Sequence, residues 1–192
     1  MKTIRDVVVI GASLGGLTAI AKIASNWPRE LPVSVLIALN TRDQPAKTVL
    51  QIIESYAHVR VTLAVDGESI KPGHIYVSPP NRHLTVGDRG VLKLEDPGFF
   101  DNAHPSVNRL FVAAAAVYGP RVIGIVLSGN QHDGVQGMQA IEAAGGVGIV
   151  QDPDDAIAPQ MPRHVIRNDS PHYCVKAFEV SPLVRRLVAG KT

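Results

Sequence analysis

The amino-acid sequence predicts an α/β fold, doubly wound, with a mainly parallel sheet, helices on both faces and an antiparallel hairpin insertion. Short, continuous runs of β-branched and other apolar residues alternate with segments of helical periodicity, which is typical of parallel strands covered on both faces. The middle of the chain differs, because turn residues recur there at short intervals without a helical period, and this favours hairpins. No repeat of fixed period and no low-complexity linker divides the 192 residues, so a single domain over 1–192 is expected.

The N-terminal part is expected to alternate between strands and helices. Asp6–Ile10 is a run rich in β-branched residues and is expected to be a buried strand, and Leu17–Ser25 has the pattern of a helix. A second apolar run, Val33–Leu39, precedes the amphipathic segment Pro45–Tyr56, which is expected to be helical. Val59–Val65 is the third strand that the pattern predicts.

The hairpin insertion is expected within residues 66–96, with Gly87–Gly90 as one tip. Beyond it the alternation of helix and strand resumes. The expected elements are a helix opened by Pro105, a strand over Val122–Leu127, a helix over Gly134–Ala144, a strand over Gly148–Gln151 and a last helix over Pro182–Ala189.

Composition excludes several classes of protein. A net charge of +2 and the absence of a basic run give no electrostatic footprint for nucleic acid. The single cysteine, Cys174, excludes an internal disulfide and fits a reducing compartment; it is expected to be a small buried hydrophobe in a strand. Glycines interrupt the first apolar run and no segment is long enough to span a bilayer, so a cytoplasmic protein without membrane insertion is expected.

The glycine-rich turn Gly11–Gly16 directly follows the first predicted strand. Ser13 stands where a dinucleotide fingerprint needs its second glycine, and no Gly-Lys-Ser/Thr follows as in a nucleoside-triphosphatase loop. The pattern Gly-x-Ser-x-Gly does fit, and a strand that turns at once into a helix needs small neighbours around its central residue. Such a turn presents the Ser13 hydroxyl as a nucleophile, with the Leu14 N–H as the first oxyanion donor. The alternatives are a helix start in which Ser13 only packs or caps, and, with less support, a turn that binds phosphate.

Further motifs extend over nearly the whole chain. They are "IGASLGG", "DGESIKPGHIYVSPPNRHL", "HPSVNRLF", "GIVLSGNQHDGVQGM", "AAGGVGIVQD" and "MPR". In number and order they resemble the catalytic domain of CheB-type chemotaxis protein-glutamate methylesterases. The resemblance implies a parallel α/β sheet with the active site at the carboxyl ends of the strands. It also implies hydrolysis of γ-glutamyl methyl esters on chemoreceptor helices by a serine, a histidine and an aspartate, without a cofactor or metal.

Carried over by position, the resemblance assigns the family's serine to Ser13 and its aspartate to Asp133, in "LSGNQHDG". Without the resemblance, Asp133 would be expected as a turn residue or N-cap before the next helix. The family's histidine position, after the second strand, is occupied by Asn40, in "IALNTRD". Asparagine can orient a hydroxyl or a water, but it has no nitrogen lone pair that accepts the serine proton. Physiological methylesterase activity would then require another base.

Two histidines are candidates for that missing role. His132 adjoins Asp133 and is the possible surrogate base, although adjacent side chains usually point apart. His104 precedes the third predicted helix, where substrate contact is as plausible as base work. His83 matches a histidine common in the family and is expected to be structural. No pair has the His-x-x-x-His spacing of a metal site.

The rim of the predicted site departs from the family more than the scaffold does. Asn130, Gln131 and His132 stand where Met-Gly-Asn is usual, and Asn108 stands where an aspartate is usual. Gly15 and Asn130 are the further turn and oxyanion candidates that the resemblance suggests. Relaxed chemistry and redirected chemistry would both leave this pattern.

Two functions therefore remain open at the level of sequence. The first is a methylesterase-type hydrolase, and the second is a catalytically impaired binding or regulatory module of the same fold. The resemblance implies methylated cytoplasmic chemoreceptor helices, or a related protein, as the partner. The first strand is expected to begin within six residues of Met1, so the receiver domain that the resemblance implies is not expected in this sequence. A separate response regulator of two-component signalling is therefore a further expected partner.

Overall fold

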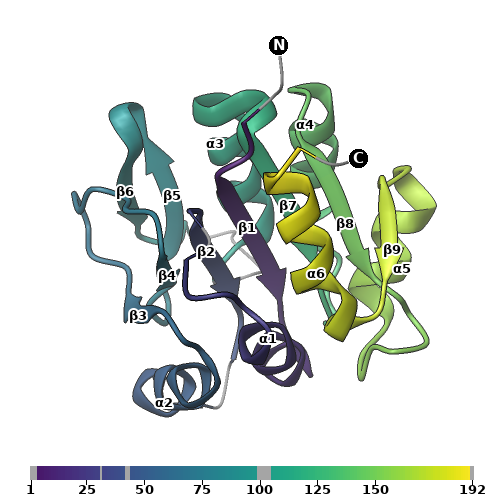
Figure 1. Cartoon of the computed structure of the whole chain (residues 1–192), viewed down its shortest axis with the longest axis horizontal. Helices are drawn as coiled ribbons and strands as arrows, with labels where there is room; N and C mark the ends of the chain where they lie inside the picture. The colour runs from purple at the N-terminus through teal and green to yellow at the C-terminus, as the bar shows by residue number, and fades with distance from the viewer. Residues whose placement is uncertain (1–3, 31, 42–43, 99–104, 191–192) are drawn as a thin grey trace.

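The computed structural model describes residues 4–30, 32–41, 44–98 and 105–190 (Figure 1). Its centre is a seven-stranded sheet in the order β3-β4-β2-β1-β7-β8-β9, and every neighbouring pair in it is parallel. A separate antiparallel pair is formed by β5 and β6. The strands are β1 (Val7–Ala12), β2 (Ser34–Leu39), β3 (Arg60–Leu63), β4 (His74–Val77), β5 (His83–Gly87), β6 (Val91–Glu95), β7 (Val122–Val126), β8 (Val147–Gln151) and β9 (Tyr173–Val175).

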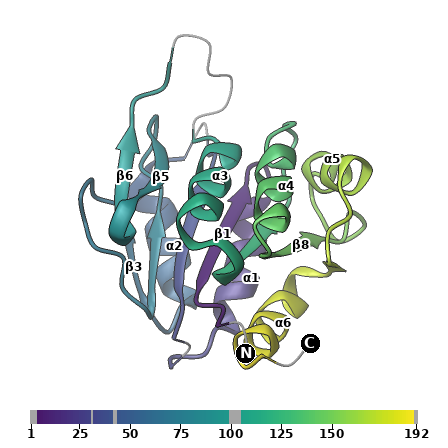
Figure 2. The same ribbon diagram turned by 90° about the horizontal axis from the view of Figure 1, so that it is seen from above.

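Helices cover both faces of the sheet, as Figures 1 and 2 show. One apolar core joins the sheet to α1 (Gly16–Ser25), α2 (Ala46–Tyr56) and α6 (Ala177–Val188). A second core joins the opposite face to α3 (Val107–Tyr118), α4 (Val135–Ala143), α5 (Gln160–Asn168) and the β5–β6 hairpin. Short 3₁₀ turns occupy Asp88–Gly90 and Gly119–Arg121. In the described part of the chain, no helix is long and apolar enough to cross a membrane.

Strand β1 shows why its sequence is apolar without alternation. Val8 and Ile10 pack into the core beneath α1 and α6, whereas Val7 and Val9 pack into the core beneath α3. Successive side chains of a strand point to opposite faces, and here both faces are covered. The predicted fold class is therefore confirmed, including the hairpin insertion with its tip at Gly87–Gly90.

The order of the strands also defines where a ligand can bind. The chain leaves β1 to form β2 on one side of it, and later returns to form β7 on the other side. In open α/β sheets, the carboxyl ends of the strands at such a reversal border a crevice. The loops after β1, β2 and β7 meet at this point.

Two predicted elements differ from the structure. The sequence predicts antiparallel hairpins around His74–Val77, but β4 pairs in parallel with both β2 and β3. The predicted start of the last helix, Pro182, is also wrong, because α6 begins at Ala177, where the Glu179 side chain accepts a hydrogen bond from the Lys176 N–H. Pro182 lies inside this helix, where it has no N–H to donate to the carbonyl four residues earlier.

The C-terminal edge of the sheet also holds two features that the apolar pattern does not indicate. Helix α5 is not predicted, because only Met161, Pro162 and Val165 of its nine residues are buried. Cys174 lies in a strand as expected, but it is exposed and not buried. Tyr173 and Val175 pack against the core beneath α1 and α6, so the Cys174 side chain between them points to the opposite face of this edge strand.

Near this edge, Glu142, His172 and Asp169 form a small cluster of ionisable side chains. From this cluster we predict that the stability of the protein depends on pH. Glu142, at the end of α4, contacts the His172 ring with 3.1 Å between Oε1 and Nδ1. Burial raises the pKa of Glu142 and the neighbouring Asp169 carboxylate raises it further, against a smaller opposing effect of His172. The native state therefore binds this proton more tightly than the unfolded chain does, so ionisation of Glu142 reduces stability as the pH rises through the raised pKa.

We expect Glu142→Gln to increase the free energy of unfolding by about 0.5–1 kcal/mol at about pH 8, because it removes an unfavourable, partly buried charge near Asp169. The gain should disappear at about pH 4, where the native carboxyl of Glu142 is protonated and resembles the amide. Urea denaturation of both proteins at the two pH values measures the difference. An equal gain at both values would contradict the electrostatic explanation.

Candidate active site

The turn between β1 and α1 presents Ser13 at the carboxyl end of the central strand. Strand β1 ends at Ala12, α1 begins at Gly16, and Gly15 has a left-handed φ of 77°. A Cβ on Gly15 would lie 2.5 Å from the Cβ of Ile157 and 2.7 Å from the Oγ of Ser128. Both the backbone conformation and the close packing therefore require glycine at this position, and they explain this part of the Gly-x-Ser-x-Gly pattern.

Ser13 and Asn40 lie side by side at the ends of adjacent strands. The last paired residues of β1 and β2 are Ala12 and Leu39, and the Asn40 N–H donates to the Ala12 carbonyl over 3.0 Å. The next residue of each strand is therefore Ser13 on β1 and Asn40 on β2. Both are largely buried, with exposed fractions of 8% and 7%, and both line the same cleft. The structure thus brings the predicted nucleophile next to Asn40, the position where the resemblance leads us to expect a histidine.

Asp133 approaches from the loop after β7 and binds the start of helix α3. Its Oδ2 accepts the Val107 N–H over 2.5 Å, and its Oδ1 accepts the Asn108 N–H over 2.9 Å. The Ser106 hydroxyl is a further donor, 3.4 Å from Oδ1. Asp133 therefore caps α3, whereas local sequence alone predicts a cap on the following helix α4. A carboxylate has about four acceptor positions, so these contacts leave room for one more donor.

Asn108 makes the reciprocal contact between the same two helices. Its Oδ1 accepts the N–H groups of Gly134 and Gly137 over 3.1 and 2.8 Å, at the start of α4. The helices pack closely, because a Cβ on Gly137 would lie 2.5 Å from the Cβ of Phe111. The aspartate that the resemblance leads us to expect at position 108 would offer the same acceptor oxygen as Asn108, and the asparagine present here keeps the cap of α4.

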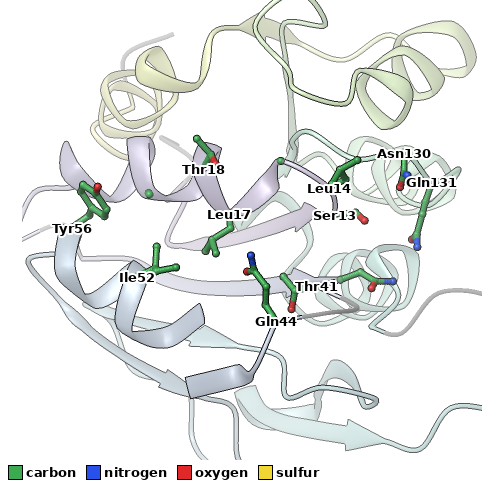
Figure 3. A pocket seen from close by; sticks show the side chains of 13 residues that line it. Ser13, Leu14, Leu17, Thr18, Thr41, Gln44, Ile52, Tyr56, Asn130 and Gln131 are labelled. Carbon is green, nitrogen blue, oxygen red and sulfur yellow. The ribbon is translucent and has the colours of Figure 1, made fainter. Parts of the chain in front are cut away.

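A cleft of about 790 Å³ opens beside Ser13 (Figure 3). Asn130 and Gln131 lie near Ser13, and Gln44 lies further along the cleft beside Leu17. The cleft continues between α1 and α2. The lining residues are Ser13, Leu14, Gly15, Leu17, Thr18, Ala21, Asn40, Thr41, Gln44, Ile52, Tyr56, Asn130 and Gln131. Among the residues that the structure describes, none that lines the cleft is a histidine or carries a charge.

The two ends of the cleft differ in chemistry. Figure 3 shows Ser13 close to Asn130 and Gln131 at one end, and Ile52 and Tyr56 at the other. Leu17 lies between them. The cleft therefore offers hydrogen bonds near the serine and an apolar arm between the two helices, which suits a ligand with an uncharged polar tip and an apolar neighbour.

The oxyanion candidates lie beside Ser13 as expected from their positions. Within the described residues, the backbone N–H groups of Leu14 and Gly15 and the Ser13 hydroxyl have no hydrogen-bond partner. The two N–H groups precede the first turn of α1, where the helix dipole adds positive potential. Asn130 is exposed at the rim of the same cleft. This arrangement can stabilise negative charge on a carbonyl oxygen next to the serine.

The histidines singled out by the sequence lie elsewhere. The ring of His132 packs against His164 of α5, with 4.0 Å between ring centroids, and His132 does not line the cleft. Burial and the nearby His132 lower the pKa of His164. His83 is fully buried and its Nδ1 accepts the Ser106 N–H over 3.0 Å, so it supports the start of α3. His104 lies outside the described residues. In the described ranges, no three His, Cys, Asp or Glu side chains are grouped as a metal site.

Comparison with known proteins agrees with this fold. The family model described as CheB methylesterase matches residues 8–184, which is nearly the whole chain.

The chain belongs to the CheB methylesterase family.

Its relatives differ in length. A protein of Leptospira interrogans, named putative protein-glutamate methylesterase/protein-glutamine glutaminase, is 31% identical over 95% of this chain and 94% of its own length. A protein-glutamate methylesterase/protein-glutamine glutaminase of Myxococcus xanthus is 30% identical over 94% of this chain, which spans only 53% of that relative. The crystal structure of the CheB methylesterase catalytic domain of Thermotoga maritima is 27% identical, covers 97% of this chain and all of its own, and has a TM-score of 0.89.

Proposed function

We propose that this chain binds glutamyl methyl ester and glutamine side chains of a helical protein of the chemoreceptor type in the cleft at Ser13. We further propose that Asn40 holds hydrolysis of these groups far below the rate of relatives with histidine at this position. The observation that carries the proposal is the neighbouring pair of Ser13 and Asn40, in a cleft whose described lining contains no imidazole. The names of the relatives supply the two substrates, a glutamate ester and a glutamine amide.

Both substrates fit the chemistry of the cleft. Each is an uncharged carbonyl derivative, and the described lining carries amides and hydroxyls but no charge near Ser13. The N–H groups of Leu14 and Gly15, which have no partner among the described residues, are donors for the carbonyl oxygen. Binding therefore needs only groups that the cleft retains, whereas hydrolysis needs a base to take the Ser13 proton.

A peptide-binding experiment tests the first half of the proposal. A helical receptor fragment that carries one glutamyl methyl ester is compared with the same fragment carrying alanine there, using the unmodified protein and isothermal titration calorimetry. We expect the ester to bind at least about tenfold more tightly, because its carbonyl pairs with the donors beside Ser13. Equal affinities would overturn the proposal.

The apolar arm of the cleft predicts a second effect on binding. Tyr56 is half exposed at the far end of the arm and is available for contact with the peptide. We expect Tyr56→Ala to weaken the binding of the ester fragment about fivefold to tenfold, as is common for a large aromatic contact. Phe178→Ala is the matched control, because Phe178 is a similarly exposed aromatic outside the cleft. An equal loss in both variants would assign the effect to general destabilisation.

A further inference from the structure

Ser128 joins the active-site turn to two neighbouring loops. It follows β7 and is almost completely buried, with 1% of its surface exposed. Its carbonyl accepts the Ser13 N–H over 3.0 Å. Its hydroxyl accepts the Ala158 N–H over 2.8 Å and donates to the Leu14 carbonyl over 2.7 Å. Two of these contacts hold the active-site turn at Ser13 and Leu14, and the third ties Ser128 to Ala158 in the loop before α5.

The direction of the hydroxyl proton follows from the neighbours of Ser128. The Ala158 N–H can only donate, so the Ser128 oxygen is the acceptor in that contact and its own proton is free for a carbonyl. The Leu14 carbonyl is nearer, at 2.7 Å, than the Ala158 carbonyl, at 3.4 Å. The hydroxyl therefore holds the Leu14 carbonyl on the side of β7.

Fixing this carbonyl also fixes an N–H group beside Ser13. The peptide between Leu14 and Gly15 is planar, and in a trans peptide the N–H points opposite to the carbonyl. Because the carbonyl points to Ser128, the Gly15 N–H points away from it. Gly15 lines the cleft, and its N–H has no partner within the described residues.

Ser128 is itself held by a chain of hydrogen bonds that reaches helix α6. Its N–H donates to Oε1 of the buried Gln151 over 2.9 Å. The Gln151 Nε2 donates to Oδ2 of Asp155 over 2.8 Å, and the same oxygen accepts the Ala177 N–H over 2.9 Å. Burial alone would raise the pKa of Asp155, but the hydrogen bonds from Ala177 and Gln151 and the nearby lysines hold it below its usual value. The acceptor at the end of the chain thus stays charged at neutral pH.

We propose that Ser128 is a positioning residue of the active-site turn, whose hydroxyl orients the Leu14–Gly15 peptide so that the Gly15 N–H faces the carbonyl oxygen of a bound glutamyl group. This inference rests on the proposed function, because it assumes that a carbonyl binds beside Ser13. It adds a role for a buried hydroxyl that does not itself touch the ligand.

The first test is a structural measurement that needs no turnover. Amide hydrogen exchange and ¹⁵N chemical shifts of Gly15 and Gly16 are compared among the wild type, Ser128→Ala and Ser128→Thr. We expect Ser128→Ala to shift both signals and to speed exchange of the Gly16 N–H, which donates to the Ser13 carbonyl over 2.8 Å, by about tenfold. Ser128→Thr keeps the hydroxyl and should restore both properties. Where the alanine variant does not fold, Ser128→Cys replaces it as a weaker donor.

Ser78→Ala is the matched control, since the Ser78 hydroxyl is buried, has no hydrogen-bond partner among the described residues and lies outside the cleft. It should leave the signals of Gly15 and Gly16 unchanged. Unchanged signals in Ser128→Ala as well would overturn the inference.

The second test measures ester hydrolysis with Asn40→His as the starting protein. Adding Ser128→Ala should lower kcat by about tenfold to a hundredfold with little change in KM, because a misdirected donor weakens binding of the developing oxyanion more than of the ester. Adding Ser128→Thr should preserve kcat. An equal kcat with and without the Ser128 hydroxyl would contradict the role in positioning. If Asn40→His hydrolyses no ester, the proposed function fails on its own, and the exchange measurement still decides on Ser128.

Discussion

Replacing Asn40 by histidine is expected to raise hydrolysis of glutamyl methyl esters by this protein at least about 10³-fold. Ser13 and the N–H groups of Leu14 and Gly15 lie at the end of β1, and Asp133 lies in the loop after β7. In the proposed function, the missing part is a group that can accept the Ser13 proton. In serine hydrolases, loss of the base lowers turnover by about 10⁶-fold, while the oxyanion donors and binding alone retain about 10³-fold over water. Restoring an imidazole next to Ser13 should recover part of this difference.

The comparison uses a methylated receptor fragment and p-nitrophenyl acetate with the wild type, Asn40→His and the double variant Asn40→His/Ser13→Ala. The double variant should return to the wild-type rate, which shows that the gain passes through the serine. Thr41→His is the matched control, because it places an imidazole in the same cleft one residue beyond the position beside Ser13. It should give little gain.

The proposed loss of the base would be contradicted if the wild type hydrolysed the ester as fast as Asn40→His does and if Ser13→Ala abolished this activity. His132 would then be the next residue to replace, although its ring packs against His164. His132→Gln would remove an imidazole base while it preserves much of the side-chain size. A loss of turnover in that variant would identify His132 as the surrogate.

Much of the fold is predictable because its strands are buried on both faces. Apolar runs such as Val33–Leu39 and Val122–Leu127 are typical of such strands, and the structure places β2 and β7 within them. Elements with one exposed face are harder to predict. Helix α5 buries three residues and β9 is a short edge strand, so neither leaves a strong pattern. The start of α6 is hidden by Pro182, because proline is more common in the first turn of a helix than in its interior.

The sequence predicts the site residues that follow the ends of strands. It does not predict the contacts of the site that join segments distant in sequence. Ser13 and Asn40 each follow an apolar run, and parallel pairing places such ends together. The reciprocal caps formed by Asp133 and Asn108, and the hydroxyl contact of Ser128 with the Leu14 carbonyl, join segments that are distant in sequence. No local pattern marks these partners, since Asp, Asn and Ser are ordinary residues at loops and helix starts.

Asp133 should affect both stability and chemistry, and the two effects can be separated. We expect Asp133→Ala to lower the free energy of unfolding by about 2–3 kcal/mol, because the Val107 and Asn108 N–H groups at the buried start of α3 lose a charged acceptor. Asn108→Ala removes the reciprocal acceptor from the start of α4 and should destabilise the protein by about 1–2 kcal/mol. Urea denaturation measures both values.

Of these two residues, Asp133 should have much the larger effect on hydrolysis once a histidine is present. In the Asn40→His protein, the free acceptor capacity of the Asp133 carboxylate can hold the imidazole in the tautomer that accepts the Ser13 proton. An amide offers one acceptor oxygen and a donor in its place, so Asp133→Asn should lower kcat by about 10²–10⁴-fold while it keeps part of the cap. Asn108→Ala should reduce kcat far less despite its loss of stability. If the two variants lowered kcat equally, Asp133 would act on turnover through the packing of α3 against α4, and its carboxylate would have no separate part in orienting the base.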